Sequence, residues 1–109
     1  MSKFVLVYRG GEVPPEEQDE SMARLGQWIG GLVASKKQVG GMPLEPSGKV
    51  VSDEGVMEYV DADDSVDGYS VLEVANLDEA VEIAKGAPVV DHGGMVEVRP
   101  VMEMPDMPM

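Results

Sequence analysis

The sequence predicts an α+β domain in which two helices cover one face of a sheet. Strand-like runs of β-branched and aromatic residues alternate with two segments whose apolar residues recur every three or four positions. Along the chain the order is β-α-β-β-β-α-β. The 109 residues suffice for one domain, which we assign to residues 1–101, followed by a tail at 102–109.

The first strand and the first helix occupy the N-terminal third of the chain. Lys3–Tyr8 is β-branched and aromatic, and glycines close it. A helix is expected from Glu16 to Ser35, because the acidic residues of its first turns interact favourably with the helix dipole. Trp28, at the edge of the apolar stripe, is expected to anchor this helix on the sheet. The stripe itself consists of Met22, Leu25, Ile29, Leu32 and Val33.

Three glycines lie inside this helix, namely Gly26, Gly30 and Gly31. Each costs about 1 kcal/mol relative to alanine in a helix interior. Two explanations stay open. Either a neighbouring element, such as the sheet, approaches the helix backbone closely, or the helix frays or bends near Gly30–Gly31.

The centre of the chain contains short strands and one strong strand. Residues 38–46, 48–51 and 56–60 are expected to be short strands, the last two joined by a turn at 52–55. After a loop at 61–67, residues 68–74 form a strand with apolar side chains on both faces.

The C-terminal part contains the second helix and the last strand. Asn76 is expected to cap the helix, because Glu79, three residues later, gives the spacing of a capping box. Gly86 and Pro88 end the helix. A loop at 89–94 leads to the last strand at 95–101. The tail at 102–109, rich in methionine and proline, is expected to be extended or disordered.

These elements predict a ferredoxin-like sandwich whose uncovered sheet face needs a partner. Two helices cover only one face, yet Phe4–Tyr8 is apolar at every position and Tyr69–Val74 carries apolar groups on both faces. Apolar patches above a few hundred Å² usually mark an interface. We therefore predict a homodimer joined sheet to sheet across a two-fold axis.

Charge and composition exclude several classes of partner and site. The 21 acidic and 8 basic residues give a net charge of −13, so nucleic acid and anionic membrane surfaces would be repelled. The absence of cysteine excludes disulfides and thiolate chemistry, and the single histidine excludes a two-histidine metal site within one chain. No apolar run has the length of a membrane span or a signal peptide, and a cytoplasmic location is expected.

Two groups of residues are candidates for a functional site. His92, beside a carboxylate, is the candidate catalytic base, and a solvated loop histidine is the alternative. Arg99 and Glu97 share one face of the last strand. Arg99 either binds a carboxylate or enolate in a cavity or pairs with Glu97. Tyr8 and Tyr69 either add hydroxyl groups to that cavity or serve as core rings.

An acidic segment imitates part of a calcium-binding loop without completing it. Asp61, Asp63, Ser65 and Asp67 match the first four ligand positions, but the positions that require glycine and a final glutamate hold other residues. We interpret the segment as a solubilising acidic face. We predict neither a metal site nor a cofactor.

Several segments carry a family resemblance. The most specific is Gly93–Val101, with the sequence GGMVEVRPV, and Gly40–Leu44, Gly68–Ser70 and Leu77–Ala80 fit the same pattern. Over about residues 3–101 the chain resembles the YCII-related (DGPF) domain family. The resemblance implies a dimeric α+β barrel, in which the sheets of two ferredoxin-like protomers face each other around a cavity.

Two motifs of that family have no counterpart here. The Asp-Gly-Pro-Phe motif that names the family is absent. The resemblance would also place a His and Asp pair early in the chain of enzyme-like members, but no histidine precedes His92. That pair is therefore not carried over to this sequence.

Two functions of different class follow from these observations. The first is a small-molecule-binding protein whose inter-sheet cavity holds an apolar or carboxylated metabolite. The second is a cofactor-independent enzyme that performs isomerase, lyase or proton-transfer chemistry on an enolisable substrate. The position of His92 relative to Arg99 discriminates between them, because a catalytic pair must reach the same pocket.

Overall fold

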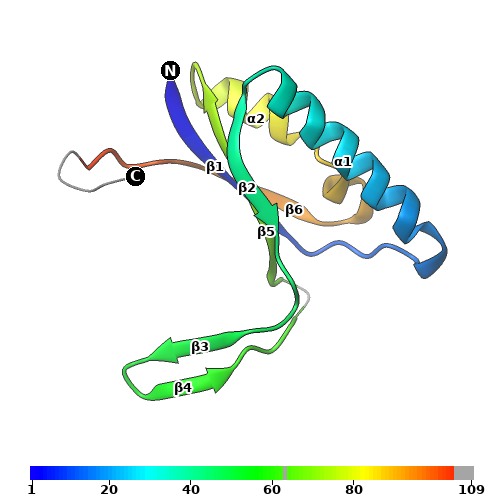
Figure 1. Ribbon diagram of the computed structural model, residues 1–109, viewed down its shortest axis with the longest axis vertical. Coiled ribbons are helices and arrows are strands. Elements are labelled where there is room, and N and C mark those ends of the chain that lie inside the picture. Colours follow the sequence, from blue (N-terminus) through cyan, green and yellow to red (C-terminus); the bar gives the residue numbers. More distant parts are fainter. Residues whose placement is uncertain (63, 105–109) are drawn as a thin grey trace.

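The computed structural model describes residues 1–62 and 64–104. Its elements follow the predicted order, with two short 3-10 helices in addition (Figure 1). They are β1 (Ser2–Arg9), η1 (Pro15–Glu17), α1 (Gln18–Ala34), β2 (Gln38–Pro43), β3 (Lys49–Ser52), β4 (Gly55–Glu58), β5 (Val66–Val74), α2 (Leu77–Ala84), η2 (Pro88–His92) and β6 (Met95–Pro100).

Four strands form the main sheet, in the order β2-β5-β1-β6 with every neighbouring pair antiparallel. β1 therefore lies between two strands, as its apolar residues on both faces require. α1 connects β1 to β2, and α2 connects β5 to β6. This strand order with these connections is the ferredoxin-like fold, so the predicted fold class is confirmed.

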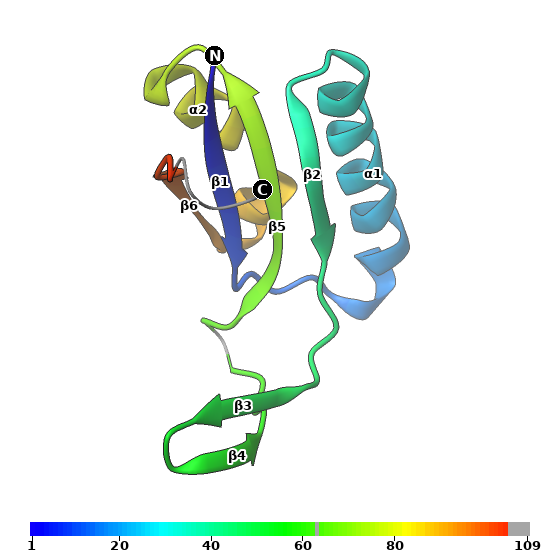
Figure 2. The same cartoon turned by 60° about the vertical axis from the view of Figure 1, so that its left-hand side comes forward.

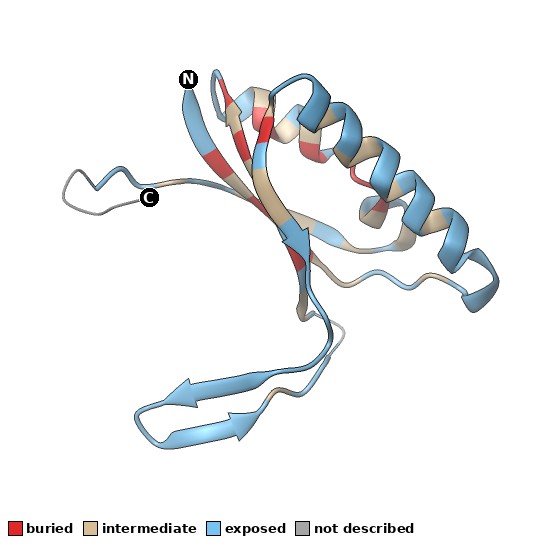
Figure 3. Ribbon diagram, in the orientation of Figure 1, coloured by how far each residue is buried: buried red, intermediate tan, exposed pale blue. Residues whose placement is uncertain are grey.

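Both helices lie on the same side of this sheet (Figures 1 and 2). On β1 the buried positions alternate with half-buried Val5 and Val7, which belong to the opposite, uncovered face. Figure 3 shows the buried positions along the central strands and α2. The core residues are Phe4, Leu6, Tyr8, Leu72, Val74, Ala80, Ala84 and Ala87.

The three glycines inside α1 lie at positions with open space around them. A side-chain carbon at Gly26, Gly30 or Gly31 would meet no atom of the described chain within 4 Å. The first explanation, a close approach by a neighbouring element of the described chain, is therefore wrong. The helix also continues through all three positions to Ala34, so it does not fray there.

Trp28 anchors α1, as predicted. Its side chain packs against the core, and its ring meets that of Tyr8 edge to face at a centroid distance of 6.2 Å. This geometry is the favoured one for an aromatic pair.

β3 and β4 form a separate two-stranded sheet that projects away from the main sheet (Figures 1 and 2). Both predicted strands are present, with a turn of only two residues between Ser52 and Gly55. All eight strand residues are exposed. We call β3, β4 and their turn, residues 49–58, the arm.

The predicted cap of α2 is also confirmed. Asn76 Oδ1 accepts a hydrogen bond from the Glu79 backbone N–H at 2.9 Å. Glu79 Oε1 in turn accepts one from the Ala75 N–H at 2.9 Å, one residue earlier than in an ideal capping box.

Two further predictions concern the loops and the tail. The loop expected at 89–94 is largely the 3-10 helix η2. Residues 102–104 have no regular secondary structure, and the rest of the predicted tail lies outside the described residues. None of the described helices combines the length and apolar character needed to cross a membrane, and the cytoplasmic location stays a prediction.

Candidate functional site

A pocket of about 170 Å³ lies between α1, η2 and one end of the main sheet. Most of its lining is apolar, and its side chains come from segments far apart in sequence. Its apolar lining residues are Val13, Leu25, Ile29, Met42, Pro43, Ala87, Pro88 and Val89, and its polar lining residues are Tyr8, Ser21, Asp67, Tyr69 and His92. Gly10, Gly11 and Gly68 contribute backbone.

The glycine pair after η2 sets the position of η2, which borders this pocket. Gly93 adopts a left-handed conformation with φ of 81°. A side-chain carbon at Gly94 would lie 2.5 Å from Val89 Cγ2 and 2.7 Å from the Arg9 carbonyl oxygen. Only glycine at position 94 lets η2 lie this close to the end of β1. The segment that carried the family resemblance thus has a physical reason for its two glycines.

His92 ends η2 and borders the pocket. Its backbone carbonyl accepts a hydrogen bond from the Glu12 N–H at 3.0 Å, which ties η2 to the loop after β1. Its Nε2 atom is buried and has no hydrogen-bond partner within residues 1–62 and 64–104. A buried polar atom without a partner costs free energy, and a ligand with a polar group would relieve that cost.

Tyr8 contributes a neutral hydroxyl to the same pocket. Its oxygen lies 2.6 Å from Ser70 Oγ in a buried hydrogen bond. Burial raises the pKa of the Tyr8 hydroxyl, and the hydrogen bond with Ser70 lowers it by a smaller amount. Tyr8 therefore keeps its proton at neutral pH and serves as a hydrogen-bonding group.

Asp67 lies where the pocket meets a second, more polar cavity of about 570 Å³. Partial burial and the neighbouring carboxylate of Asp61 raise the pKa of Asp67, while a hydrogen bond from the Gly10 backbone lowers it. Both effects that raise the pKa disfavour negative charge at this position. The second cavity also contains Arg9, Glu12, Asp61, Asp64, His92 and Met95.

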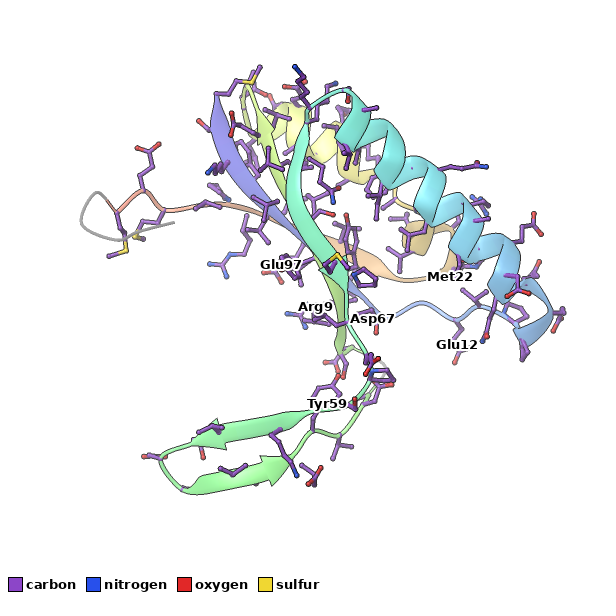
Figure 4. The ribbon with its side chains drawn as sticks, viewed as in Figure 1. Arg9, Glu12, Met22, Tyr59, Asp67 and Glu97 are labelled. Atoms are coloured by element: carbon purple, nitrogen blue, oxygen red, sulfur yellow. The ribbon has the colours of Figure 1, made fainter. Side chains whose placement is uncertain are left out.

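Arg9 lines the second cavity. Its Nη1 donates to the Asp64 carbonyl oxygen at 3.0 Å, and its Nε lies 3.6 Å from Glu97 Oε1. Figure 4 places Arg9, Glu97 and Asp67 near the end of the sheet from which the arm leaves. Because Arg9 already has a carboxylate partner, it is poorly suited to hold an anion in this cavity.

The predicted site residues divide into two groups. Tyr8, Tyr69 and His92 all border the first pocket, although Tyr69 pairs with Val7 at a strand position that belongs to the uncovered face. Arg99 and Glu97 do not: their positions on β6 pair with Val5 and Val7 on the uncovered face of the sheet. Arg99 Nη1 lies 3.8 Å from Glu97 Oε2, and the Arg99 side chain is 72% exposed. His92 and Arg99 therefore do not converge on either of these cavities.

The inter-sheet cavity implied by the resemblance needs a second copy of the chain and stays a prediction. Arg99 and Glu97 belong to the face that would border it.

Sequence reasoning missed Asp67 as a pocket residue. In the sequence Asp67 stands out only as a member of the acidic segment. In the structure it lies directly before Gly68, at the beginning of β5. No group of three or more metal-ligating side chains that could hold a metal ion occurs in the described part of the chain, which leaves out Asp63 and Asp106.

The fold and the pocket together define a ferredoxin-like α+β protein with an apolar pocket beneath its first helix. The model of the YCII-related domain matches residues 1–105. The chain therefore belongs to the YCII-related family, as its sequence motifs suggested.

One similar solved structure is 5-chloro-2-hydroxyhydroquinone dehydrochlorinase from Burkholderia phenoliruptrix AC1100, in complex with 2,5-dihydroxybenzoquinone. It is 21% identical, the match covers 86% of this chain and 90% of that one, and the TM-score is 0.52. At this identity the likeness supports the fold alone. No curated protein matches the chain.

Proposed function

We propose that this protein binds a small molecule with a single ring in the pocket beneath α1. The observation that carries the proposal is the combination of size and lining: about 170 Å³, bordered mainly by apolar side chains. An apolar protein cavity of about 150 Å³ is known to accept benzene. The pocket thus has the volume of one ring and little more.

The polar groups of the pocket favour a neutral ligand with a hydroxyl or carbonyl group. Such a group would pair with Nε2 of His92, which has no hydrogen-bond partner in the part of the chain that the structure describes. A carboxylate would meet Asp67 instead, in a chain whose net charge is −13. Of the two metabolite types that the sequence suggested, we therefore favour the apolar one.

Phenol is the probe that tests this proposal. We expect saturable amide shifts in 15N–1H NMR spectra for residues 10–13, 67–69 and 87–92, which surround the pocket. Benzoate is expected to bind at least tenfold more weakly, because its charge faces Asp67. Equal affinity for benzoate would contradict the neutral ligand, and no saturable shift with either compound would overturn the pocket as a binding site.

A matched pair of variants locates the binding. Leu25→Phe fills the pocket from α1 and is expected to abolish the response to phenol. Val33→Phe adds the same group on the same helix at a position that is 53% exposed, and the response should stay unchanged.

A second candidate function is cofactor-independent proton transfer on an enolisable ligand. The specific observation in its favour is that His92 and Asp67 both border both cavities, so two groups able to exchange protons lie beside one ligand position. Deuterium exchange at the carbon next to a ligand carbonyl, followed by NMR, tests it. The wild type should catalyse the exchange and His92→Gln should not, even at phenol-analogue concentrations that saturate the variant in the NMR titration.

We further propose that the chain is a homodimer joined through the uncovered sheet face. Support comes from Val5, Val7 and Val71, which are apolar, adjacent in register and only half-buried. Apolar association does not weaken with salt, and screening reduces the repulsion between two copies of charge −13. Light scattering is expected to give a dimer at micromolar concentration, at low and at high salt. A monomer under these conditions would contradict the proposal.

A further inference from the structure

The arm has no structural support from the rest of the described chain. All eight of its strand residues are exposed, and β3 and β4 pair only with each other. A two-stranded hairpin on its own is marginally stable in water. An arm of this length therefore needs a surface to pack on.

Both faces of the arm carry apolar side chains. Val51 pairs with Val56 on one face, and Val50 pairs with Met57 on the other. Their exposed fractions are 76%, 65%, 43% and 63%, respectively. The Lys49–Glu58 ion pair lies beside Val51 and Val56, and Ser52 lies beside Val50 and Met57, so each face joins one apolar pair to polar residues at one end. Four exposed apolar side chains in eight strand residues are nevertheless typical of a segment that another surface covers.

The arm borders the same face of the sheet that lacks a helix layer. Figure 1 shows it leaving the end of the main sheet and projecting on the side opposite α1 and α2. A second copy seated on the uncovered face would thus lie alongside the arm. We infer that the arm of each protomer packs on a second copy of this chain, and this inference rests on the proposed homodimer.

The area that a dimer can bury supports a second copy of the chain as the surface that covers the arm. Strands about 4.8 Å apart with a rise of about 3.3 Å per residue give a four-stranded face, six residues long, of about 400 Å². Stable interfaces bury about 600–1,000 Å² of accessible surface per partner, so the flat footprint of the sheet face alone makes only a small contact. One face of the arm adds roughly 130 Å², and the surface under the partner's arm adds as much again. With both arms engaged, the area reaches the range of stable dimers.

The absence of cysteine makes a direct test simple. Asp53→Cys places one nitroxide label in the turn of the arm, and the labelled protein is mixed with an unlabelled, 15N-enriched copy. We expect paramagnetic broadening of the partner's amides on the uncovered face, near Val5, Val7 and Val71. The same label on α2, through Asp78→Cys, should leave those amides sharp. Sharp amides on the uncovered face of the 15N-enriched copy, in a sample that light scattering shows to be dimeric, would overturn the arm's role.

Removal of the arm separates this inference from the dimer itself. Replacing residues 49–58 by a short Gly-Ser linker should leave the circular dichroism of the helices intact and raise the dimer dissociation constant at least tenfold. An unchanged dissociation constant would overturn the arm's role and leave the dimer standing. A monomeric wild type would overturn both. If the shortened chain does not fold, the broadening experiment on the full chain decides.

Discussion

Leu6→Asp is expected to prevent folding. Leu6 is fully buried at the centre of β1, the strand that pairs on both sides, and its surroundings are apolar except for Ser70, whose hydroxyl is already bonded to Tyr8. An unpaired carboxylate there costs several kcal/mol, besides the packing lost with the leucine. Domains of this size are stable by about 5–15 kcal/mol in total. We expect no soluble protein, or a chain without helical circular dichroism and without a cooperative thermal transition.

The neighbouring variant Val5→Asp is the matched control. It adds the same charge to the same strand, but Val5 is half-buried on the opposite, uncovered face. The variant should keep the fold and, if the dimer uses this face, give a monomer in light scattering. A folded Leu6→Asp protein would contradict the assignment of the core to the helix side of β1.

This difference between adjacent residues illustrates how far the sequence predicts the fold. The unbroken apolar run Phe4–Tyr8 indicated a central strand with two buried faces, because an edge or half-exposed strand alternates. It did not indicate which of Val5 and Leu6 contacts the helices. That assignment depends on the direction from which α1 and α2 pack, which is a property of the whole topology.

For the arm, the sequence predicts the strands but not their position relative to the main sheet. The strands and their turn could be predicted from local composition, because β-branched residues flank a short acidic turn. Whether a hairpin joins the main sheet or projects from it depends on hydrogen-bonding partners elsewhere in the chain, and no local residue pattern encodes that choice.

The candidate site was predictable only in part, and the reason is strand register. Alternation places Arg99 and Glu97 on one face of β6, opposite Val98. Only the pairing of Arg99 with Val5 reveals that this is the uncovered face. Tyr8 and His92 meet at the pocket because η2 folds back onto the end of β1, through a contact whose only sequence signal is the glycine pair after His92.

Gly41→Ala is expected to destabilise the fold strongly, although it adds only one methyl group. Gly41 lies in β2 with φ of 125°, which residues with side chains rarely adopt. An added carbon would also lie 2.3 Å from the Tyr69 carbonyl oxygen and 2.6 Å from Ser70 Cα. Both are backbone atoms of β5, so β2 and β5 would have to separate. We expect a loss of about 3 kcal/mol or more in the free energy of unfolding.

Gly30→Ala gives the opposite expectation for the same change of residue. Gly30 is exposed in the middle of α1, and an added carbon would meet no atom of the described chain within 4 Å. Alanine is favoured over glycine in a helix interior by about 1 kcal/mol, so the free energy of unfolding should rise by that amount.

Urea denaturation of both variants at one fixed protein concentration tests the pair, because dimer formation makes stability depend on concentration. Equal midpoints for Gly41→Ala and the wild type would contradict the close approach of β2 to β5. Since Met42 and Pro43 follow directly and line the pocket, Gly41→Ala should also weaken phenol binding, which Gly30→Ala should leave intact.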